Sequence, residues 1–301
     1  MKNVILQTGL DRRETVRRSV DALGDDFISK CREANYIFIK VNLVDSKRQL
    51  ACTHVDAVRG LLDIIRTYCK TSVIIGDASH GGTLAAFDHL GYERLLDEYS
   101  KVELVDLNDD DFVEGYTIRG DGSKNAIRRS KTATQSQMKI CVAPLKIHNE
   151  VGLDACVYSW AYGTWIVPSR ISASGKVWAR WPWLEEEGFT AHNQSIAELY
   201  KQSACDLAIT DGIIAMEGDG PIEGSAVNVG IVAAGFDAVA VDAVCSTLIG
   251  IEPLQIRYLD LIAREGLGEI ELSKINVPPM LMSQLSRQFE LPRTLMNKLS
   301  Q

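Results

Sequence analysis

Basic residues stand where two apolar segments of the sequence are expected to end as strands. Lys40 interrupts the apolar segment 36–43, and Lys146 and His148 close the apolar segment that begins at residue 138. A buried lysine is costly unless its charge is paired or solvated, and a histidine can move protons near neutral pH. We therefore predict Lys40, Lys146 and His148 as catalytic residues that bind an anion or act as acids and bases. The alternative is that each is a structural residue, hydrogen-bonded within a turn.

A glycine-rich loop follows the next predicted strand. Residues 76–83 read Gly-Asp-Ala-Ser-His-Gly-Gly-Thr and lead into a predicted helix. Glycines let backbone N–H groups turn toward an anion, and a helix N-terminus favours negative charge. The loop matches neither the dinucleotide fingerprint nor the phosphate-loop motif. The sequence predicts a site for a small anionic ligand, bound by Asn42, Ser79, Gly81 and Gly82.

A second glycine-rich segment, residues 211–224, is acidic. It holds four carboxylates and four glycines between two apolar segments. A divalent cation needs oxygen ligands on a backbone that can bend around it, although the spacing here is not that of an EF-hand loop. We predict that Asp211, Glu217 and Asp219 bind a divalent metal ion, Mg²⁺ or similar. The alternative is a solvated acidic turn.

All five tryptophans lie in residues 149–194, a segment with weak periodicity. We predict an irregular insertion or a lid, with Trp160 as a platform for the ligand. A satellite core, or the interface of a homodimer, would gather tryptophans in the same way.

The elements that must position these residues alternate between strand and helix along the chain. Strands that are apolar on both faces suit a parallel sheet covered by helices on both sides. Ligands of such sheets bind beyond the carboxyl ends of the strands, where the candidate residues stand. We predict one α/β domain over residues 1–301, with a mostly parallel sheet layered between helices and a central tryptophan-rich insertion at 149–194. The predicted strands are 4–6, 36–43, 72–76, 102–107, 138–145, 207–210 and 229–234, the predicted helices are 14–31, 53–65, 83–91, 195–203, 236–249 and 253–264, and residues 108–137 form a polar hairpin.

Two aspartates belong to the helix predicted over residues 236–249. Asp237 stands at its start, where an aspartate suits the N-terminal turn. Asp242 lies in an apolar stretch, where a carboxylate without a partner is costly. We predict that Asp242 supports the fold rather than the chemistry, by pairing with Lys40 or Lys146 or by holding a backbone N–H of the glycine loop.

The composition argues against several classes of protein. Of 301 residues, 46% are hydrophobic and 24% charged, which is typical of a globular chain. The net charge of −8 argues against a protein that coats nucleic acid. No segment approaches the ~18 to 20 apolar residues of a membrane span, and the first apolar stretch is too short for a secretory signal. The seven cysteines are scattered, which indicates reduced thiols, so we expect a cytoplasmic protein without nucleic-acid or membrane partners.

Several motifs occur in a fixed order along the chain. The short ones are residues 39–43 (Ile-Lys-Val-Asn-Leu), 53–54 (Thr-His), 76–77 (Gly-Asp) and 146–148 (Lys-Ile-His). Residues 206–221 follow the pattern D-x-x-I-x-D-G-I-x-A-M-E-G-x-G-P, and residues 234–243 follow A-G-x-D-x-V-A-V-D-A. This order resembles the domain of unknown function 362 family over about residues 36–250.

The resemblance implies a fold more than an activity. Many relatives carry a ferredoxin-like insert whose closely spaced cysteines hold iron–sulphur clusters. No CxxCxxC run occurs here, so no iron–sulphur cluster is expected. The family's Lys-Asn-x-x-Gly step corresponds here to residues 158–163, which keep the glycine and lose the lysine and the asparagine. This departure implies another substrate, or a member that is not a catalyst.

Three hypotheses follow from the candidate residues and the resemblance. The first is a metal-dependent enzyme that acts on a small anionic metabolite. The second is a non-catalytic ligand-binding protein that uses the tryptophan-rich segment. The third is a redox-associated protein related to the iron–sulphur-containing relatives.

Overall fold

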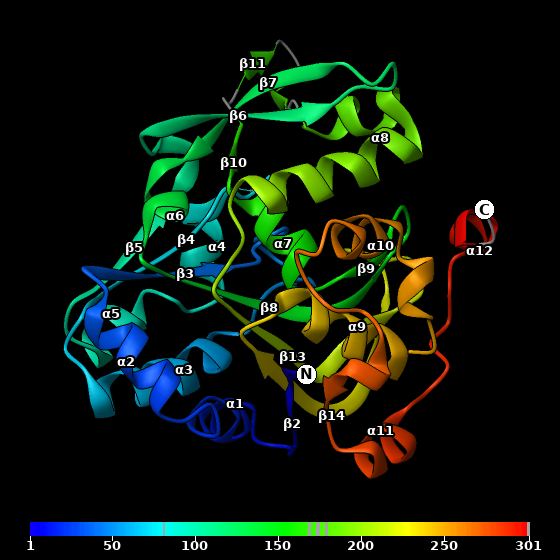
Figure 1. The fold of residues 1–301 in the computed structure, drawn as a ribbon. Helices are drawn as coiled ribbons and strands as arrows, with labels where there is room; N and C mark the ends of the chain where they lie inside the picture. The colour runs from blue at the N-terminus through cyan, green and yellow to red at the C-terminus, as the bar shows by residue number, and fades with distance from the viewer. Residues whose placement is uncertain (81, 168–169, 173–174, 178–179, 300–301) are drawn as a thin grey trace.

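The centre of the molecule is a sheet of eight strands (Figure 1). The structure is a computed structural model that describes residues 1–80, 82–167, 170–172, 175–177 and 180–299, without the side chains of residues 168–186 and 297. The strand order is β2-β14-β13-β8-β3-β4-β5, with β9 paired to β8. These strands are β2 (Ile5–Thr8), β3 (Tyr36–Val41), β4 (Ser72–Asp77), β5 (Val102–Asp106), β8 (Met138–His148), β9 (Gly152–Asp154), β13 (Leu207–Glu217) and β14 (Ser225–Gly235).

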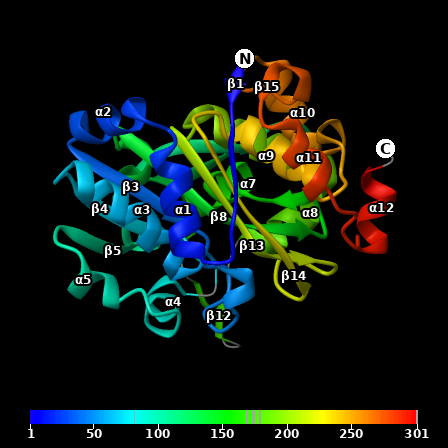
Figure 2. The ribbon, with the colours of Figure 1, turned by 90° about the horizontal axis from the view of Figure 1, so that it is seen from below.

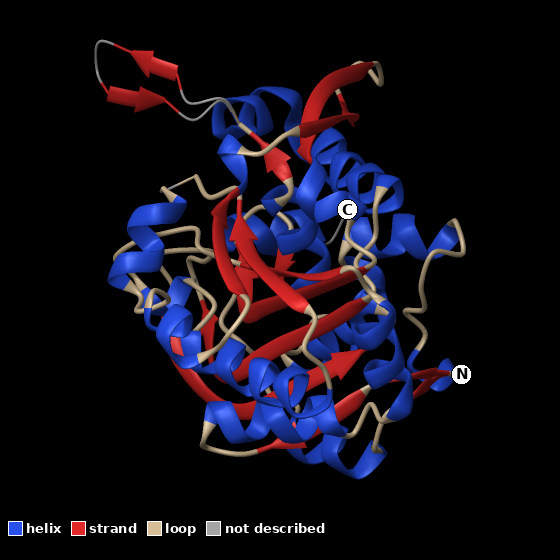
Figure 3. Ribbon diagram, turned by 90° about the vertical axis from the view of Figure 1, so that its left-hand side faces the viewer, coloured by secondary structure: helices blue, strands red, loops and turns tan. Residues whose placement is uncertain are grey.

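The strands from β13 to β5 run parallel, and the remaining pairs are antiparallel. β13 pairs with β8, β8 with β3, β3 with β4 and β4 with β5, all in parallel register. β14 is antiparallel to both β13 and β2. The predicted mostly parallel sheet is therefore confirmed. Figure 3 shows its strands side by side across the middle of the molecule, with helices around them.

Each face of the sheet carries its own apolar core. Along β8, Cys141 and Ala143 belong to one core, whereas Ile140 and Val142 belong to the other. This alternation follows from the period of two residues in a strand. Helices α1, α2 and α3 lie on one side of the sheet and α7, α9 and α10 on the other (Figure 2). The helices are α1 (Arg12–Asp21), α2 (Asp25–Glu33), α3 (Val55–Tyr68), α4 (Thr83–His89), α5 (Arg94–Glu98), α6 (Lys131–Gln135), α7 (Cys156–Gly163), α8 (Arg180–Gln202), α9 (Ala238–Leu248), α10 (Arg257–Arg264), α11 (Pro279–Leu285) and α12 (Arg293–Leu299).

Smaller sheets flank the main one. β6 (Phe112–Ile118) and β7 (Lys124–Ser130) form the hairpin that the polar segment 108–137 predicted, and β10 (Trp165–Ile166) joins β7. β11 (Arg170–Ser172) pairs with β12 (Gly175–Val177), and β1 (Lys2–Asn3) pairs with β15 (Ile275–Asn276).

Two predicted elements differ from the structure for identifiable reasons. The single helix predicted over 14–31 is two helices, α1 and α2, because the chain turns at Gly24 with a φ of 69°. The loop predicted over 211–224 is a strand as far as Glu217, since Ile214 to Glu217 pair with β14 beyond an irregularity at Gly212. The glycines of this segment indicated a loop, whereas the strand continues past a bulge.

The prediction of irregular structure for residues 149–194 is also wrong over much of that segment, which contains α7 and the first part of α8. Every residue of α7 is buried, so the helix has no polar face and shows no helical periodicity in the sequence. The helix predicted over 195–203 begins much earlier, at Arg180, and contains a break at Gly188. Trp178 and the side chains of Trp181 and Trp183 lie outside the described residues.

Candidate functional site

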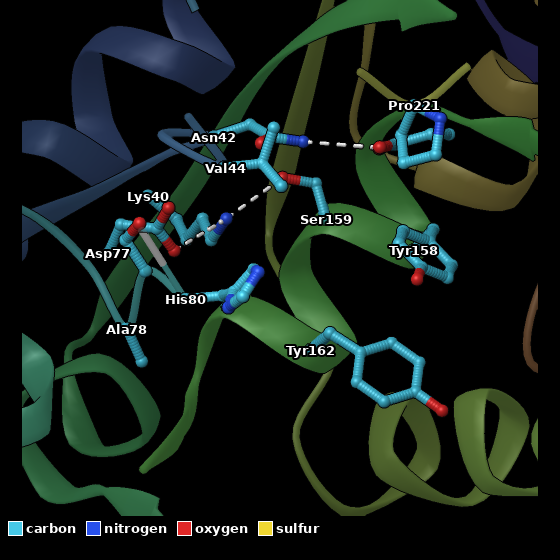
Figure 4. Close-up of a pocket in the computed structure, with 13 residues that line it drawn as sticks. Lys40, Asn42, Val44, Asp77, Ala78, His80, Tyr158, Ser159, Tyr162 and Pro221 are labelled. Atoms are coloured by element: carbon cyan, nitrogen blue, oxygen red, sulfur yellow. Dashed lines mark hydrogen bonds and ion pairs between the residues drawn. The ribbon is translucent and has the colours of Figure 1, made fainter. Parts of the chain in front are cut away.

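A small polar pocket lies where β3 and β4 end against helix α7 (Figure 4). Its cavity has a volume of about 90 Å³. An apolar cavity of about 150 Å³ holds benzene, so the closed part of this pocket suits a ligand of only a few atoms. Its polar lining is Lys40, Asn42, Asp77, Ser79, His80, Asp154, Tyr158, Ser159 and Tyr162, together with Gly163.

Lys40 is the buried positive charge of this pocket. Its side chain is only 2% exposed, and its Nζ lies 3.0 Å from Oδ1 of Asp77. The same ammonium donates a hydrogen bond of 2.9 Å to Oγ of Ser159 on α7. A lysine ammonium has three N–H donors, and the third has no acceptor among the residues that the structure describes. Lys40 therefore retains one donor for a ligand in the pocket.

Asp77 and Gly163 fix the position of Lys40. The second oxygen of Asp77 accepts the backbone N–H of Leu43 at 2.7 Å, which holds the carboxylate beside the end of β3. A Cβ atom on Gly163 would lie 1.8 Å from Cε of Lys40 and 2.1 Å from its Nζ. Glycine is thus required at this last position of α7, because any side chain would occupy the place of the lysine.

Lys146 is a second buried lysine, with all its donors used. Its Nζ lies 3.0 Å from Asp154 and donates to the carbonyl oxygens of Ala51 at 2.7 Å and Pro221 at 3.4 Å. Asp154 also accepts a bond of 3.2 Å from Asn42. Lys146 is not one of the described residues that line the pocket. It joins β9 to Ala51 and Pro221 beside the pocket.

His148 lies behind the pocket wall. Its ring centroid is 4.6 Å from that of Tyr158, and its Nδ1 accepts the N–H of Glu150 at 3.1 Å. Burial, with a further effect of Lys146 and Lys298, lowers the pKa of His148 to about 3. Burial and His148 likewise lower the pKa of the neighbouring His192 well below its usual value. Both imidazoles are therefore neutral at physiological pH. His80, in contrast to His148, is among the residues that line the pocket.

The predicted ligand-binding residues divide between the pocket and other places. Asn42 and Ser79 line the pocket, and Ser79 donates a bond of 2.5 Å to the carbonyl of Leu43. Gly82 is the N-cap of α4, and Gly81 lies outside the described residues. Trp160 is fully buried and donates from its indole N–H to the carbonyl of Ser203 at 2.6 Å. The structure thus gives Trp160 the place of a core residue rather than of a ligand platform.

The three predicted metal ligands do not come together. Asp211 is buried against Arg12, with 2.6 Å between Nε and the carboxylate, and it also accepts the N–H of Ile213. Burial raises the pKa of Asp211, and Arg12 opposes that effect. Glu217 accepts the N–H of Glu290, and Asp219 is exposed. Among the described residues, no three acidic, histidine or cysteine side chains are grouped to hold a metal ion.

The sequence prediction missed Asp77, Asp154 and the pocket residues of α7. Asp77 stood at a strand end, where an aspartate is common for local reasons. The sequence did contain an indication that α7 matters for the site, because residues 158–163 depart from the family's Lys-Asn-x-x-Gly step. The carboxylate of Asp242 accepts the backbone N–H groups of Cys156 and Val157 at the start of α7, rather than pairing with Lys40 or Lys146. Asp237 caps α9 as predicted.

The fold and the site together define an α/β protein with a polar pocket at the carboxyl ends of parallel strands. The chain belongs to the family described as domain of unknown function (DUF362), whose model matches residues 37–247. This confirms the resemblance seen in the motifs.

Comparison with known proteins adds a relative and two solved structures. Thylakoid-associated protein sll1697 of Synechocystis sp. is 26% identical over 277 residues, which are 86% of this chain and 80% of that protein. The lactate racemase apoprotein of Thermoanaerobacterium thermosaccharolyticum is similar in fold, with a TM-score of 0.50 and 17% identity over 77% of this chain. A Thermotoga maritima protein has a TM-score of 0.41 and 9% identity over 84% of this chain. The chain spans 54% and 58% of the length of these two solved chains. Within the described part of the chain, no helix combines the length and apolarity needed to cross a membrane.

Proposed function

We propose that this protein is an enzyme that binds a small organic anion in the pocket over Lys40. The observation that carries the proposal is the third N–H of a buried ammonium, which has no acceptor among the described side chains and carbonyls. Buried ion pairs contribute little to stability on balance, so the donor of Lys40 that no described acceptor takes needs a reason other than folding. An anion that replaces the missing acceptor would provide that reason.

Ser159 would provide the second donor. Its Oγ accepts from Lys40, and no described acceptor takes its own hydroxyl hydrogen. Lys40 and Ser159 can therefore hold one oxygen of the ligand from two directions. A fixed ammonium in the pocket also stabilises negative charge that develops during a reaction.

His80 would move the proton. It lines the pocket, whereas His148 is neutral and lies behind Tyr158. An imidazole at the pocket surface can act as acid and base near neutral pH.

Asp211, Glu217 and Asp219 have no role in this proposed function. The metal dependence, the cytoplasmic location, the homodimer and the absence of nucleic-acid and membrane partners stay predictions. The likeness to lactate racemase concerns the fold, and no substrate is taken from it.

A non-catalytic binding protein is the second candidate. It is favoured by the positions of Lys146 and His148, two predicted catalytic residues that lie outside the described lining of the pocket. The two functions share the anion site and differ in whether the anion is converted.

Thermal unfolding with a panel of small carboxylates and inorganic phosphate tests the shared site. A ligand at 100 times its Kd stabilises the folded state by about 2.7 kcal/mol. We expect at least one anion to raise the Tm of the native chain, but not that of the double variant Lys40→Met, Asp77→Asn. The matched control is Lys139→Met, which removes a lysine paired with Asp206 near the amino end of β8 and should keep the response.

Two results would reject the anion site: no response of the native chain to any anion, or a full response of the double variant. Incubation of the binding anion with the native chain and with His80→Gln then separates the two functions. Conversion by the native chain alone supports the enzyme, and binding without conversion supports the binding protein.

A further inference from the structure

Helix α7 supplies four pocket residues, yet none of its own side chains caps its first turn. Ala155 occupies the N-cap position and makes no capping hydrogen bond through its side chain. The N–H groups of Cys156 and Val157 donate instead to the two carboxylate oxygens of Asp242, at 3.0 and 2.9 Å. Asp242 belongs to α9, 85 residues beyond Val157. A carboxylate from another helix therefore replaces the missing local cap.

We propose that Asp242 is a positioning residue of the pocket, which holds the first turn of α7, and that its ionisation sets how firmly that turn is held. Tyr158 and Ser159 follow directly on the capped residues. Ser159 contacts Lys40, so a shift of the turn changes the donor pair that faces the ligand. The effect on ligand binding rests on the proposed function, whereas the effect on α7 does not.

The charge of Asp242 is stabilised mainly by the backbone of α7. The carboxylate is fully buried, and no ion pair joins it to a cation in the described part of the chain. The groups that face it are acids, thiols and phenols: Asp237 and Cys245 of α9, Asp154 of β9, Cys156 of α7, Tyr200 of α8, Cys205 before β13 and Tyr258 of α10. Among the described residues, the compensation comes from the two N–H groups and from the positive end of the α7 dipole.

This balance makes Asp242 change its charge near neutral pH. Burial raises the pKa of Asp242 to about 7, and the N–H groups of Val157 and Cys156 oppose that rise. The ionised carboxylate accepts both N–H groups in charge-assisted bonds, whereas the protonated acid loses the charge and one strong acceptor. The first turn of α7 is therefore held more firmly above neutral pH than below it.

Backbone amide signals of ¹⁵N-labelled full-length protein test the inference without any ligand. Between about pH 5.5 and about pH 8.5, the Cys156 and Val157 signals should shift with one shared midpoint close to neutrality. Their hydrogen exchange, divided by the intrinsic rate at each pH, should be roughly tenfold slower on the alkaline side. Asp242→Asn should abolish the titration. Asp237→Asn, which removes the neighbouring carboxylate charge on α9 but keeps a side-chain oxygen for its cap, should preserve it.

The inference is overturned if the two signals stay constant over this range or titrate unchanged in Asp242→Asn. If that variant does not fold, the titration of the native chain alone decides. Signals that titrate in a protein that binds no anion leave the positioning role intact and reject the proposed function. Anion binding in a protein whose two signals do not titrate would reject the positioning role of Asp242 and leave the proposed function intact.

Discussion

Lys40 and Lys146 are buried lysines of neighbouring strands, each 3.0 Å from an aspartate, and they differ in how their donors are used. Lys146 is bonded to Asp154 and to two carbonyl oxygens, so its ammonium is complete within the protein. Lys40 has two partners and faces a cavity. Burial alone therefore does not distinguish a binding lysine from a structural one, whereas the count of donors does.

Replacing Gly163 by alanine tests the position of Lys40. In an unstrained helix this change stabilises by up to about 1 kcal/mol. Here the added Cβ would lie 1.8 Å from Cε of Lys40 and 2.6 Å from Oδ1 of Asp77. We expect Gly163→Ala to lower the free energy of unfolding by about 1–3 kcal/mol, measured in urea, and to abolish anion binding.

The control for this prediction is the same substitution in a Lys40→Ala background. Without Cε and Nζ the main clash is gone, so the cost of Gly163→Ala should fall clearly. Equal costs in the two backgrounds would show that Lys40 does not occupy the place beside Gly163.

At the scale of elements, α7 is the part of the site that periodicity could not reveal. All eight of its residues are buried, because the helix is enclosed by the sheet and by α8 and α9. A helix without a polar face gives no 3.6-residue pattern. The strand that carries Lys40 was recognisable for the opposite reason, since one polar residue stood out in an apolar segment.

The pH dependence of stability tests the burial of Asp242. Its pKa is about 7 in the folded chain against an ordinary value of 3.8, so over this window the folded state binds the proton and the unfolded state does not. Stability that depends on this group is present at low pH and declines as pH rises through the window. Relative to Asp242→Asn, the native chain should lose roughly 1.4 kcal/mol per pH unit between about pH 4 and about pH 7.

Taking the difference between the two proteins cancels the contributions of groups such as His148. The measurement is urea unfolding of both at several pH values. A constant difference across the window would mean that Asp242 is ionised throughout, as it is in water.

At the scale of the whole molecule, Arg129 joins the small sheet to the body. It lies on β7, is 1% exposed, and donates to the carbonyl of Leu199 on α8 at 2.9 Å and to Oγ1 of Thr164 after α7 at 2.8 Å. Both partners lie at helix C-terminal ends, where a positive charge is favoured. Burial lowers the pKa of Arg129 to about 10, so it remains charged at neutral pH.

Arg129→Met should therefore lower the free energy of unfolding by about 3 kcal/mol, because two bonds from a charged donor are lost. Its neighbour Arg128 is exposed and lies 4.2 Å from the ring centroid of Phe112. Arg128→Met should cost no more than about 1 kcal/mol. Similar losses for the two variants, measured in urea, would contradict the structural role assigned to Arg129.

The sequence was sufficient for the layered α/β fold and for part of the site. Long apolar strands separated by helices specify a parallel sheet, and Lys40, Asn42 and Ser79 stood at its carboxyl edge. The partners of Lys40 were not predictable, because Asp77 and Ser159 meet only when α7 docks on the strands. The three predicted metal ligands lie apart for a related reason: Arg12, which precedes Asp211 by 199 residues in the sequence, binds the Asp211 carboxylate.

The most direct test of the central claim is a crystal structure of the protein with the small anion that stabilises it most. The account predicts an oxygen of that anion within hydrogen-bond distance, about 2.7–3.2 Å, of both Nζ of Lys40 and Oγ of Ser159. An anion bound elsewhere while this pocket stays without it would contradict the assignment of Lys40 as the binding residue.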